Sequence, residues 1–176
     1  WKAAFPEVFA QGGFVAVVGN PPYGADLSFY DFEYLRRKFE VIHTDIETYS
    51  LFIEQSINLC KAGGKISMIV PTGWYSGAKF SRLRKIFACT TNLETIVNLP
   101  YDIFKAWVDT TIFVTSKRNN RLDWPRKESN QTQLITFPKR FQIKTQQDYE
   151  NKESEVNIVD WFNEGNDEFL TYANTN

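Results

Sequence analysis

The feature that most constrains this chain is an apolar run that ends abruptly in two prolines. Residues 14–18 read Phe-Val-Ala-Val-Val between glycines, and Asn20, Pro21, Pro22 and Tyr23 follow almost at once. Consecutive apolar residues of this kind, bounded by glycines, are typical of a strand buried on both faces of a parallel sheet. Ligands in open α/β sheets bind at the carboxyl ends of such strands. The sequence therefore predicts a buried strand that ends in a binding site.

The four residues after this strand predict a stiff loop that is rich in hydrogen-bond acceptors. Proline holds its own φ at about −65° and disfavours the helical region for the residue before it, so no helix starts at Asn20. Pro21 and Pro22 have no N–H group, so the loop offers carbonyl oxygens beside the Asn20 amide, with the Tyr23 ring just beyond. Acceptors next to an aromatic face suit a planar amine. The alternative interpretation is a rigid turn without a ligand.

This motif resembles the catalytic motif of amino methyltransferases that use S-adenosylmethionine, above all the adenine-specific DNA methyltransferases of restriction-modification systems. Four further segments occur in the order seen in the large, single-chain restriction and modification enzymes. These are residues 5–9 (Phe-Pro-Glu-Val-Phe), 49–54 (Tyr-Ser-Leu-Phe-Ile-Glu), 63–65 (Gly-Gly-Lys) and 109–114 (Asp-Thr-Thr-Ile-Phe-Val). The resemblance covers residues 1–118. It implies an α/β fold, namely part of the Rossmann-like class I methyltransferase sheet with helices on both faces.

The resemblance also implies a role for each residue of the loop. The side-chain oxygen of Asn20 and the main-chain carbonyl of Pro21 accept the two hydrogens of the target amine and hold its nitrogen in place. Pro22 completes the motif, and Tyr23 stacks on an adenine that has left the duplex. Phe52 corresponds to a residue that lies against the adenine ring of the cofactor, and a plain core phenylalanine is an equal alternative.

The chain is expected to be one part of a longer polypeptide. In the resembled family, most of the S-adenosylmethionine is bound by a first βαβ unit with a glycine-rich loop, upstream of the Asn-Pro-Pro-Tyr strand. The chain opens at Trp1 without these elements. We therefore expect residues 1–118 to be the C-terminal half of the catalytic domain, and residues 119–176 to be a linker that leads to target recognition. The rest of the parent polypeptide is then a partner, and the isolated chain is expected to be inactive.

The middle of the chain is basic, although the net charge is only −1. Positions 61–121 hold ten lysines and arginines against three acidic residues, whereas the segments on either side are acidic. A local basic segment suits contact with phosphates, so double-stranded DNA is the expected partner. Candidate phosphate contacts lie on a helix expected at 78–87, and they are Lys79, Arg82, Arg84 and Lys85. The alternative is an ordinary solvated helix face.

A second loop follows a second buried strand, which is expected at 66–70 and ends at Pro71. Trp74 and Tyr75 stand in this loop. They are candidates for nucleic-acid binding at the border of the base pocket, and core packing or anchoring of the loop is the equal alternative. The remaining elements are expected as helices at 27–39 and 46–59 and strands at 93–99, 112–115 and 134–137. About four strands of a seven-stranded sheet are thus expected in residues 1–118.

Composition excludes several classes of protein. With 43% hydrophobic residues the chain is not disordered, and no apolar run approaches the ~20 residues of a membrane span. Nothing resembles a signal peptide, so a soluble cytoplasmic protein without a membrane partner is expected. Cys60 and Cys89 lack metal-ligand spacing, so no metal is expected and both are expected to be buried and reduced.

Two other functions are open at this point. Amino methyltransferases with the same four residues also modify a glutamine side chain of a protein or a base in RNA. The segments at 5–9, 49–54 and 110–112 favour DNA adenine. The second possibility is a non-catalytic segment that binds DNA or supports the structure of a larger restriction protein.

Overall fold

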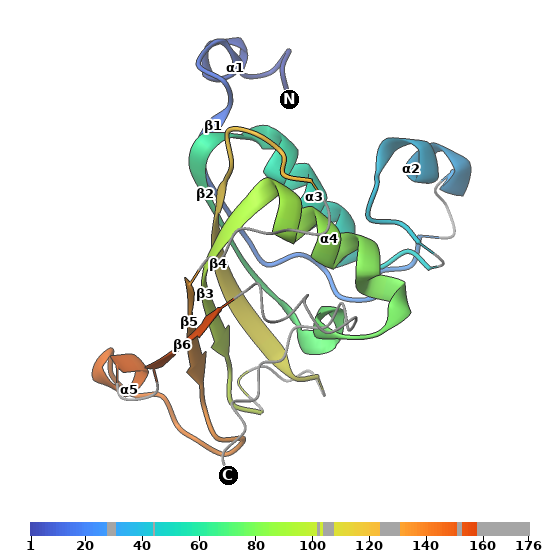
Figure 1. The fold of residues 1–176 in the computed structure, drawn as a ribbon. Helices are drawn as coiled ribbons and strands as arrows, with labels where there is room; N and C mark the ends of the chain where they lie inside the picture. Colours follow the sequence, from blue (N-terminus) through green and yellow to red (C-terminus); the bar gives the residue numbers. More distant parts are fainter. Residues whose placement is uncertain are drawn as a thin grey trace.

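The computed structural model contains a six-stranded mixed sheet with the strand order β1-β2-β4-β3-β5-β6 (Figure 1). The strands are β1 (Phe14–Gly19), β2 (Cys60–Pro71), β3 (Thr91–Asn98), β4 (Thr110–Lys117), β5 (Gln131–Thr136) and β6 (Glu153–Asn157). β1 is parallel to β2 and β3 is parallel to β5, whereas β4 runs antiparallel to both of its neighbours. The structure describes residues 1–27, 31–43, 45–101, 103, 108–123, 131–150 and 153–157.

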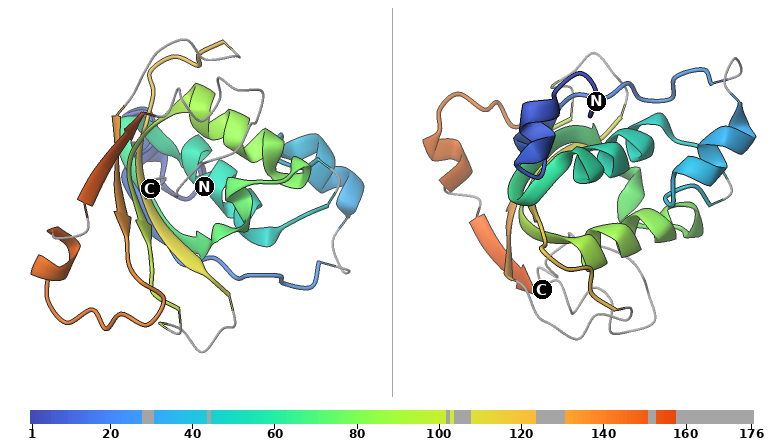
Figure 2. Two further views of the ribbon diagram at one scale, coloured as in Figure 1. Left: turned by 60° about the horizontal axis from the view of Figure 1, so that its bottom comes forward. Right: turned by 90° about the horizontal axis from the view of Figure 1, so that it is seen from above.

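Helices cover both faces of this sheet, as expected. The helices are α1 (Pro6–Ala10), α2 (Phe32–Lys38), α3 (Thr48–Leu59), α4 (Ser81–Thr90) and α5 (Gln147–Glu150), with two 3-10 turns, η1 (Thr72–Tyr75) and η2 (Ala78–Phe80). α3 and α4 lie side by side on one face, and α5 lies on the other (Figures 1 and 2). The predicted α/β class is confirmed. In the described ranges no helix is both long and apolar enough to cross a membrane.

The strands divide their apolar side chains between the two faces, because successive side chains of a strand point to opposite sides. On β2, Met68 and Val70 face α3 and α4, and Ile69 faces the other side. On β4, Phe113 faces α3 and α4, and Ile112 faces the other side. The second face is covered by a smaller cluster, which includes Val97, Leu99, Ile135, Phe137 and Tyr149 of α5.

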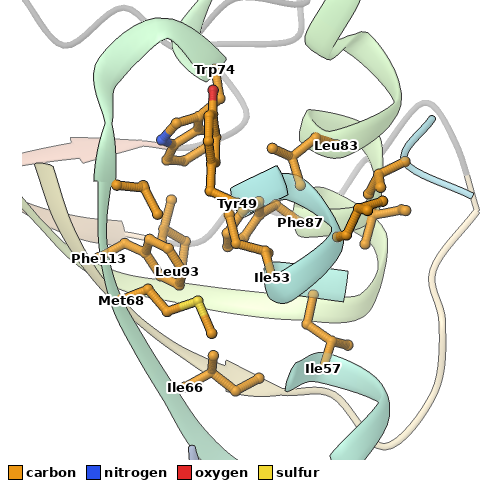
Figure 3. Close-up of a cluster of buried hydrophobic side chains, with 14 of the residues drawn as sticks. Tyr49, Ile53, Ile57, Ile66, Met68, Trp74, Leu83, Phe87, Leu93 and Phe113 are labelled. Atoms are coloured by element: carbon orange, nitrogen blue, oxygen red, sulfur yellow. The ribbon is translucent and has the colours of Figure 1, made fainter. Parts of the chain in front are cut away.

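Side chains from α3 and α4 fill the larger core above the sheet (Figure 3). Tyr49, Ile53 and Ile57 recur at every fourth residue of α3, and all three are buried. Leu83 and Phe87 repeat this spacing on α4, and neither is exposed to solvent. Apolar residues at this spacing form one stripe on a helix, so burying that stripe against the sheet stabilises both helices where they are.

Two glycines allow β1 and β2 to begin close together. A side chain at Gly13 would overlap the carbonyl oxygen of Leu59, and the φ of Gly13 is +125°. A Cβ at Gly64 would lie 2.5 Å from the sulfur of Cys60 and 3.0 Å from the carbonyl oxygen of Phe14. Cβ atoms do not approach other atoms this closely, so both positions require glycine. These two residues therefore fix the pairing of β1 with β2, on which the loop after β1 depends.

β1 differs from the expected strand. It was expected to be buried on both faces, but Val15 and Val18 are 66% and 80% exposed. This prediction is wrong for the described chain because β1 stands at the edge of the sheet and, among the described residues, pairs with β2 alone. An apolar run predicts that a strand has side chains suited to a buried position. Whether other elements cover the strand depends on its place in the strand order, which the run does not reveal.

Three helices also begin later than expected. The helix expected at 78–87 is α4, which begins at Ser81 after the 3-10 turn η2. The helix expected at 27–39 begins at Phe32, where the side chain of Asp31 accepts the N–H of Tyr34 at 3.0 Å and caps the first turn. Residues 28–30 and 158–176 lie outside the described residues, as do most of residues 101–107. The helix expected at 46–59 begins at Thr48. The strand expected at 134–137 is confirmed as β5.

Glu54 joins α3 to the segment that follows α2. Its side chain is buried, and its carboxylate accepts the main-chain N–H groups of Glu40 and Val41 at 3.1 and 2.9 Å. Burial raises the pKa of the Glu54 carboxyl above its ordinary 4.5, and the two hydrogen bonds oppose this shift only in part. Burial of the charged Glu54 carboxylate therefore lowers the stability of the folded protein at neutral pH, and protonation of the carboxylate removes this loss.

We expect Glu54→Gln to change how stability depends on pH. A raised folded-state pKa means that the native protein binds the proton more tightly than the unfolded chain does. This contribution is complete below the unfolded pKa of about 4.5 and is lost as the pH rises through the folded-state pKa. The stability of the wild type relative to Glu54→Gln should therefore grow as the pH falls toward 4.5. Urea unfolding at several pH values measures this difference, and a difference that does not vary with pH would contradict it.

Candidate active site

The Asn-Pro-Pro-Tyr loop leaves the sheet at the carboxyl end of β1, beside the parallel strand β2. Gly19, the last residue of β1, pairs with Met68 of β2. Asn20 follows and is exposed, whereas Pro21 is buried. The side-chain oxygen of Asn20 and the carbonyl of Pro21 thus stand in adjacent residues at the end of the strand, which is where the sequence predicted a site.

Tyr23 folds back over this end of the sheet. Its hydroxyl oxygen lies 3.1 Å from Oδ1 of Asn20 and 3.1 Å from the main-chain oxygen of Ile69. A phenol carries one proton, so it donates fully to only one of these acceptors at a time. Burial raises the pKa of Tyr23, so the hydroxyl is a neutral donor at physiological pH. Oδ1 of Asn20 has two lone pairs, so it can accept an amine hydrogen beside the Tyr23 hydroxyl or in its place.

A cavity of about 600 Å³ opens beside the loop, and we call it the site cavity. Asn20 and Pro21 line it from the end of β1, and Phe52 and Gln55 line it from α3. Phe52 is 47% exposed, in contrast to the buried stripe of the same helix. Cavities of this size hold small molecules and cofactors, and an exposed aromatic ring offers a face on which a planar group can stack.

A second hollow adjoins the site cavity. Its volume is about 540 Å³, and it extends from Phe52 and Pro22 to Leu27, Tyr34 and other residues of α2 and its surroundings. The two hollows share Phe52, Pro22, Gln55 and Trp1 in their linings. The two hollows adjoin each other beside the loop, and Asn20 and Pro21 line only the site cavity, so together the hollows provide room for two ligands near the acceptors.

Trp74 and Tyr75 lie in the core, away from the site cavity. Trp74 has no exposed surface and stacks on Phe87 with 4.9 Å between ring centroids. Tyr75 is 8% exposed, and its hydroxyl lies 2.7 Å from Oδ1 of Asn98 and 2.6 Å from Oγ1 of Thr111. The structure corrects the assignment of these two residues to nucleic-acid binding. They anchor the loop after β2, which was the alternative interpretation.

Arg84 is also part of the protein interior. Its side chain is 2% exposed, and its guanidinium donates to the main-chain oxygens of Trp74 and Gly77 at 3.2 and 3.0 Å. A phosphate has no access to a group in this position. The candidate phosphate contact at Arg84 is therefore corrected to a structural role, in which a buried cation holds the loop that precedes α4.

The other three basic residues of this region lie at the surface. Lys79 forms an ion pair with Glu47. Arg82 is exposed, and it donates to the main-chain oxygen of Ile42 at 2.6 Å. Lys85 is exposed one turn further along α4. Because a carbonyl acceptor carries no charge, the charge of Arg82 is not compensated by its partner, whereas that of Lys79 is.

Sequence reasoning missed several residues that line the site cavity, among them Gln55, Ser56 and Met68. Gln55 and Ser56 follow Phe52 by three and four positions, so they lie on the same side of the helix. That spacing was a usable signal. Met68 reaches the cavity because β2 pairs with β1, and this register has no local signal in the sequence.

Neither cysteine lines the site cavity. Cys60 and Cys89 are both free and buried, as predicted. Burial also raises the pKa of the Cys60 thiol, which disfavours the reactive thiolate. Among the residues that the structure describes, no group of three or more His, Cys, Asp or Glu side chains is arranged to hold a metal ion.

The sequence matches the model of a known protein family. The model of the family described as Eco57I restriction-modification methylase matches residues 1–104. The putative type II restriction enzyme and methyltransferase RM.MjaORFECS2P of Methanocaldococcus jannaschii is 30% identical over 141 residues, which are 80% of this chain and 11% of that protein. The chain thus spans about one tenth of the length of this relative.

Solved structures share the fold at low sequence identity. A modification subunit of a putative type I restriction enzyme from Vibrio vulnificus superposes with a TM-score of 0.65 at 18% identity, over 97% of this chain and 40% of that one. A putative class I S-adenosylmethionine-dependent methyltransferase from Listeria monocytogenes gives a TM-score of 0.55 at 24% identity, over 70% of this chain and 36% of that one. The sheet described above therefore shares its architecture with these solved methyltransferase and modification-subunit structures.

Proposed function

Because this chain belongs to the Eco57I restriction-modification methylase family, we propose that it carries the acceptor loop of an enzyme that methylates the exocyclic amine of adenine in double-stranded DNA. The proposed methyl donor is S-adenosylmethionine. The observation that carries the proposal is the loop of residues 20–23, which stands at the end of β1 beside the site cavity. Since the chain spans a small part of its relative, the activity is proposed for the full-length protein.

The loop suits an amine because it offers acceptors in adjacent residues. In the proposed reaction the side-chain oxygen of Asn20 and the carbonyl oxygen of Pro21 each accept one hydrogen of the amine. These two bonds hold the nitrogen in place, draw its lone pair out of conjugation with the ring and stabilise the positive charge that develops on it. The surplus proton leaves to solvent afterwards, so the site needs no strong base.

The site cavity fits the proposed methyl donor. Phe52 presents a half-exposed ring to a cavity of suitable volume, and the Asn20 side chain opens into the same cavity. When bound, S-adenosylmethionine supplies an electrophilic methyl group on a positively charged sulfur. We propose that Phe52 stacks on the adenine ring of S-adenosylmethionine in the site cavity. Pro22, which lines both hollows, stands between the site cavity and the second hollow. Exclusion of water by these apolar walls strengthens the hydrogen bonds to the target amine.

The exposed edge of the sheet supports the proposed domain division. Among the described residues β1 pairs only with β2, and it exposes Val15 and Val18, so its other edge suits pairing and packing with further elements of a methyltransferase domain. We propose that residues 1–118 are the C-terminal half of that domain. Residues 119–176, of which β5 and β6 extend the sheet, are proposed to lead toward target recognition.

Tyr23 gives a prediction that separates its ring from its hydroxyl. We expect Tyr23→Phe to keep methyl transfer within about threefold, because the ring still stacks on the base and Asn20 loses only a competing donor. Tyr23→Ala should lower kcat/KM for DNA by roughly 10- to 100-fold, since stacking of one base is worth about 1–3 kcal/mol. Steady-state kinetics with a duplex substrate measure both. Equal losses in the two variants would contradict a stacking role.

The class of substrate is tested by following the methyl group. The full-length protein is incubated with labelled S-adenosylmethionine and, separately, with duplex DNA, tRNA and a protein extract. Label in DNA supports the proposal. Label in RNA or in protein would keep the amine chemistry of the loop and overturn DNA as the substrate.

A further inference from the structure

A hollow of about 630 Å³ lies between α2, α3 and α4, and we call it the basic groove. Six exposed cationic side chains line it, and they come from three parts of the chain. They are Arg36, Arg37 and Lys38 of α2, Arg82 and Lys85 of α4, and Arg121 beyond β4. The carboxylates in its lining are Glu40 and Glu54. The cations outnumber the carboxylates by three to one, in a chain whose net charge is −1.

Partners within the protein hold three of these cations in place. Arg36 donates to the main-chain oxygen of His43 at 3.3 Å, and Arg82 donates to that of Ile42. Arg121 and Glu40 form a two-bond pair at 3.1 and 2.8 Å, which fixes the guanidinium at one side of the groove.

The basic groove is separate from the site cavity. The two hollows share no lining residue, because they lie on different sides of α3. Phe52 and Gln55 face the site cavity, whereas Glu54 and Asn58 face the groove. The groove does meet the second hollow, because Lys38 and Phe39 line both. It therefore adjoins the methyl-transfer site without being part of the site cavity, and its ligand does not have to be the reacting base.

The lining indicates what kind of anion fits. Arginine suits phosphate because its planar fork donates two hydrogen bonds at once. The apolar side chains of the groove, Phe39 and Ile86, are only 8% and 5% exposed. The groove thus has cations to pair with phosphates and no open aromatic face on which a base stacks. This combination favours the backbone of a nucleic acid over a free nucleotide.

We propose that the basic groove binds the phosphate backbone of the duplex DNA that the enzyme methylates. The choice of duplex DNA as the nucleic acid rests on the proposed function, whereas the binding of phosphates rests on the lining of the groove. The contacts are independent of sequence, so the groove adds affinity and orients the duplex while the loop of residues 20–23 acts on the base. Half of its cations belong to α2, in a part of the sequence that is acidic overall, so the sequence pattern did not reveal the groove.

The test uses the salt dependence of DNA binding by the full-length protein. The variant is Arg37→Gln with Lys85→Gln, and the matched control is Arg140→Gln with Lys139→Gln, an exposed pair outside the groove. Fluorescence anisotropy with a labelled duplex gives the slope of log K against log salt. Each lost phosphate contact lowers the slope by about 0.9, so we expect a decrease of about 2 and roughly tenfold weaker binding near physiological salt. The control pair should leave both values unchanged.

Two further measurements keep the outcomes distinct. Each single substitution should give about half the change, so the test stands even if the double variant folds poorly. Asn20→Ala should keep the wild-type salt slope, because Asn20 lies outside the groove. If the wild type methylates DNA but the groove variant binds with an unaltered slope, the groove proposal fails and the proposed function stands.

A last experiment with inorganic phosphate tests whether the groove binds small anions instead of DNA. If phosphate raises the melting temperature of the wild type but not of the groove variant, while DNA binding is the same in both, the groove is a site for small anions. That result would overturn the assignment to DNA. If the wild type transfers its methyl group to another class of molecule and DNA binding does not depend on the groove, both proposals fail.

Discussion

Replacing Asn20 by alanine is expected to lower kcat for methyl transfer by at least about 100-fold while the affinity for S-adenosylmethionine changes less than about twofold. Removing one preorganised hydrogen-bonding group that acts on developing charge costs about 10²- to 10³-fold in rate. The loop itself should survive the substitution. Tyr23 keeps the main-chain oxygen of Ile69 as an acceptor at 3.1 Å, and the strand before the loop does not involve the Asn20 side chain. Single-turnover kinetics and equilibrium binding of the cofactor separate the two effects.

Asn20→Asp is the matched control for this experiment. Aspartate keeps an acceptor oxygen in the same place and adds a negative charge that favours the positive nitrogen. We therefore expect it to retain activity within about tenfold of the wild type. If Asn20→Ala is as active as the wild type, or if the aspartate variant is as inactive as the alanine variant, acceptance of the amine hydrogen at this position is excluded.

Trp74→Ala is expected to lower the free energy of unfolding by about 3–5 kcal/mol, because removing a large buried aromatic leaves a cavity that the core fills only in part. Trp74 is fully buried, stacks on Phe87 and meets the ring of Phe113 with 6.2 Å between centroids. Urea unfolding followed by circular dichroism measures the loss. The KM for DNA in the folded fraction should stay close to that of the wild type.

Tyr34→Ala is a suitable control, because this residue is 51% exposed on α2 and its removal should cost less than about 1 kcal/mol. The alternative interpretation of Trp74, as a wall of the base pocket, predicts the opposite pattern. A loss of stability no larger than that of the control, together with a raised KM for DNA, would contradict the core role that the structure assigns to Trp74.

The parts of the fold that follow from local patterns were predictable. The run at 14–18 and the proline loop after it identified the end of β1, and the spacing of Tyr49, Ile53 and Ile57 identified the buried face of α3. These signals are local because a strand or a helix displays its pattern within a few turns. The late start of α2 was not predictable from periodicity, because the side chain of Asp31 caps the helix in the middle of an apolar stretch.

Burial of individual side chains was harder to predict, because it depends on contacts between distant elements. Arg82, Arg84 and Lys85 look alike in the sequence, yet only Arg84 turns inward to the loop before α4. Val18 looks like a core residue but stands on the edge strand. In both cases the packing of elements, which is set by long-range register, decides between surface and interior.

The most direct test of the central proposal is to identify the methylated nucleoside. Duplex DNA is treated with the full-length protein and S-adenosylmethionine, digested to nucleosides and analysed by mass spectrometry, with the Asn20→Ala protein in parallel. We expect N6-methyladenine from the wild type and none above background from the variant. A methyl group on cytosine, or the same yield of N6-methyladenine from both proteins, would contradict the account.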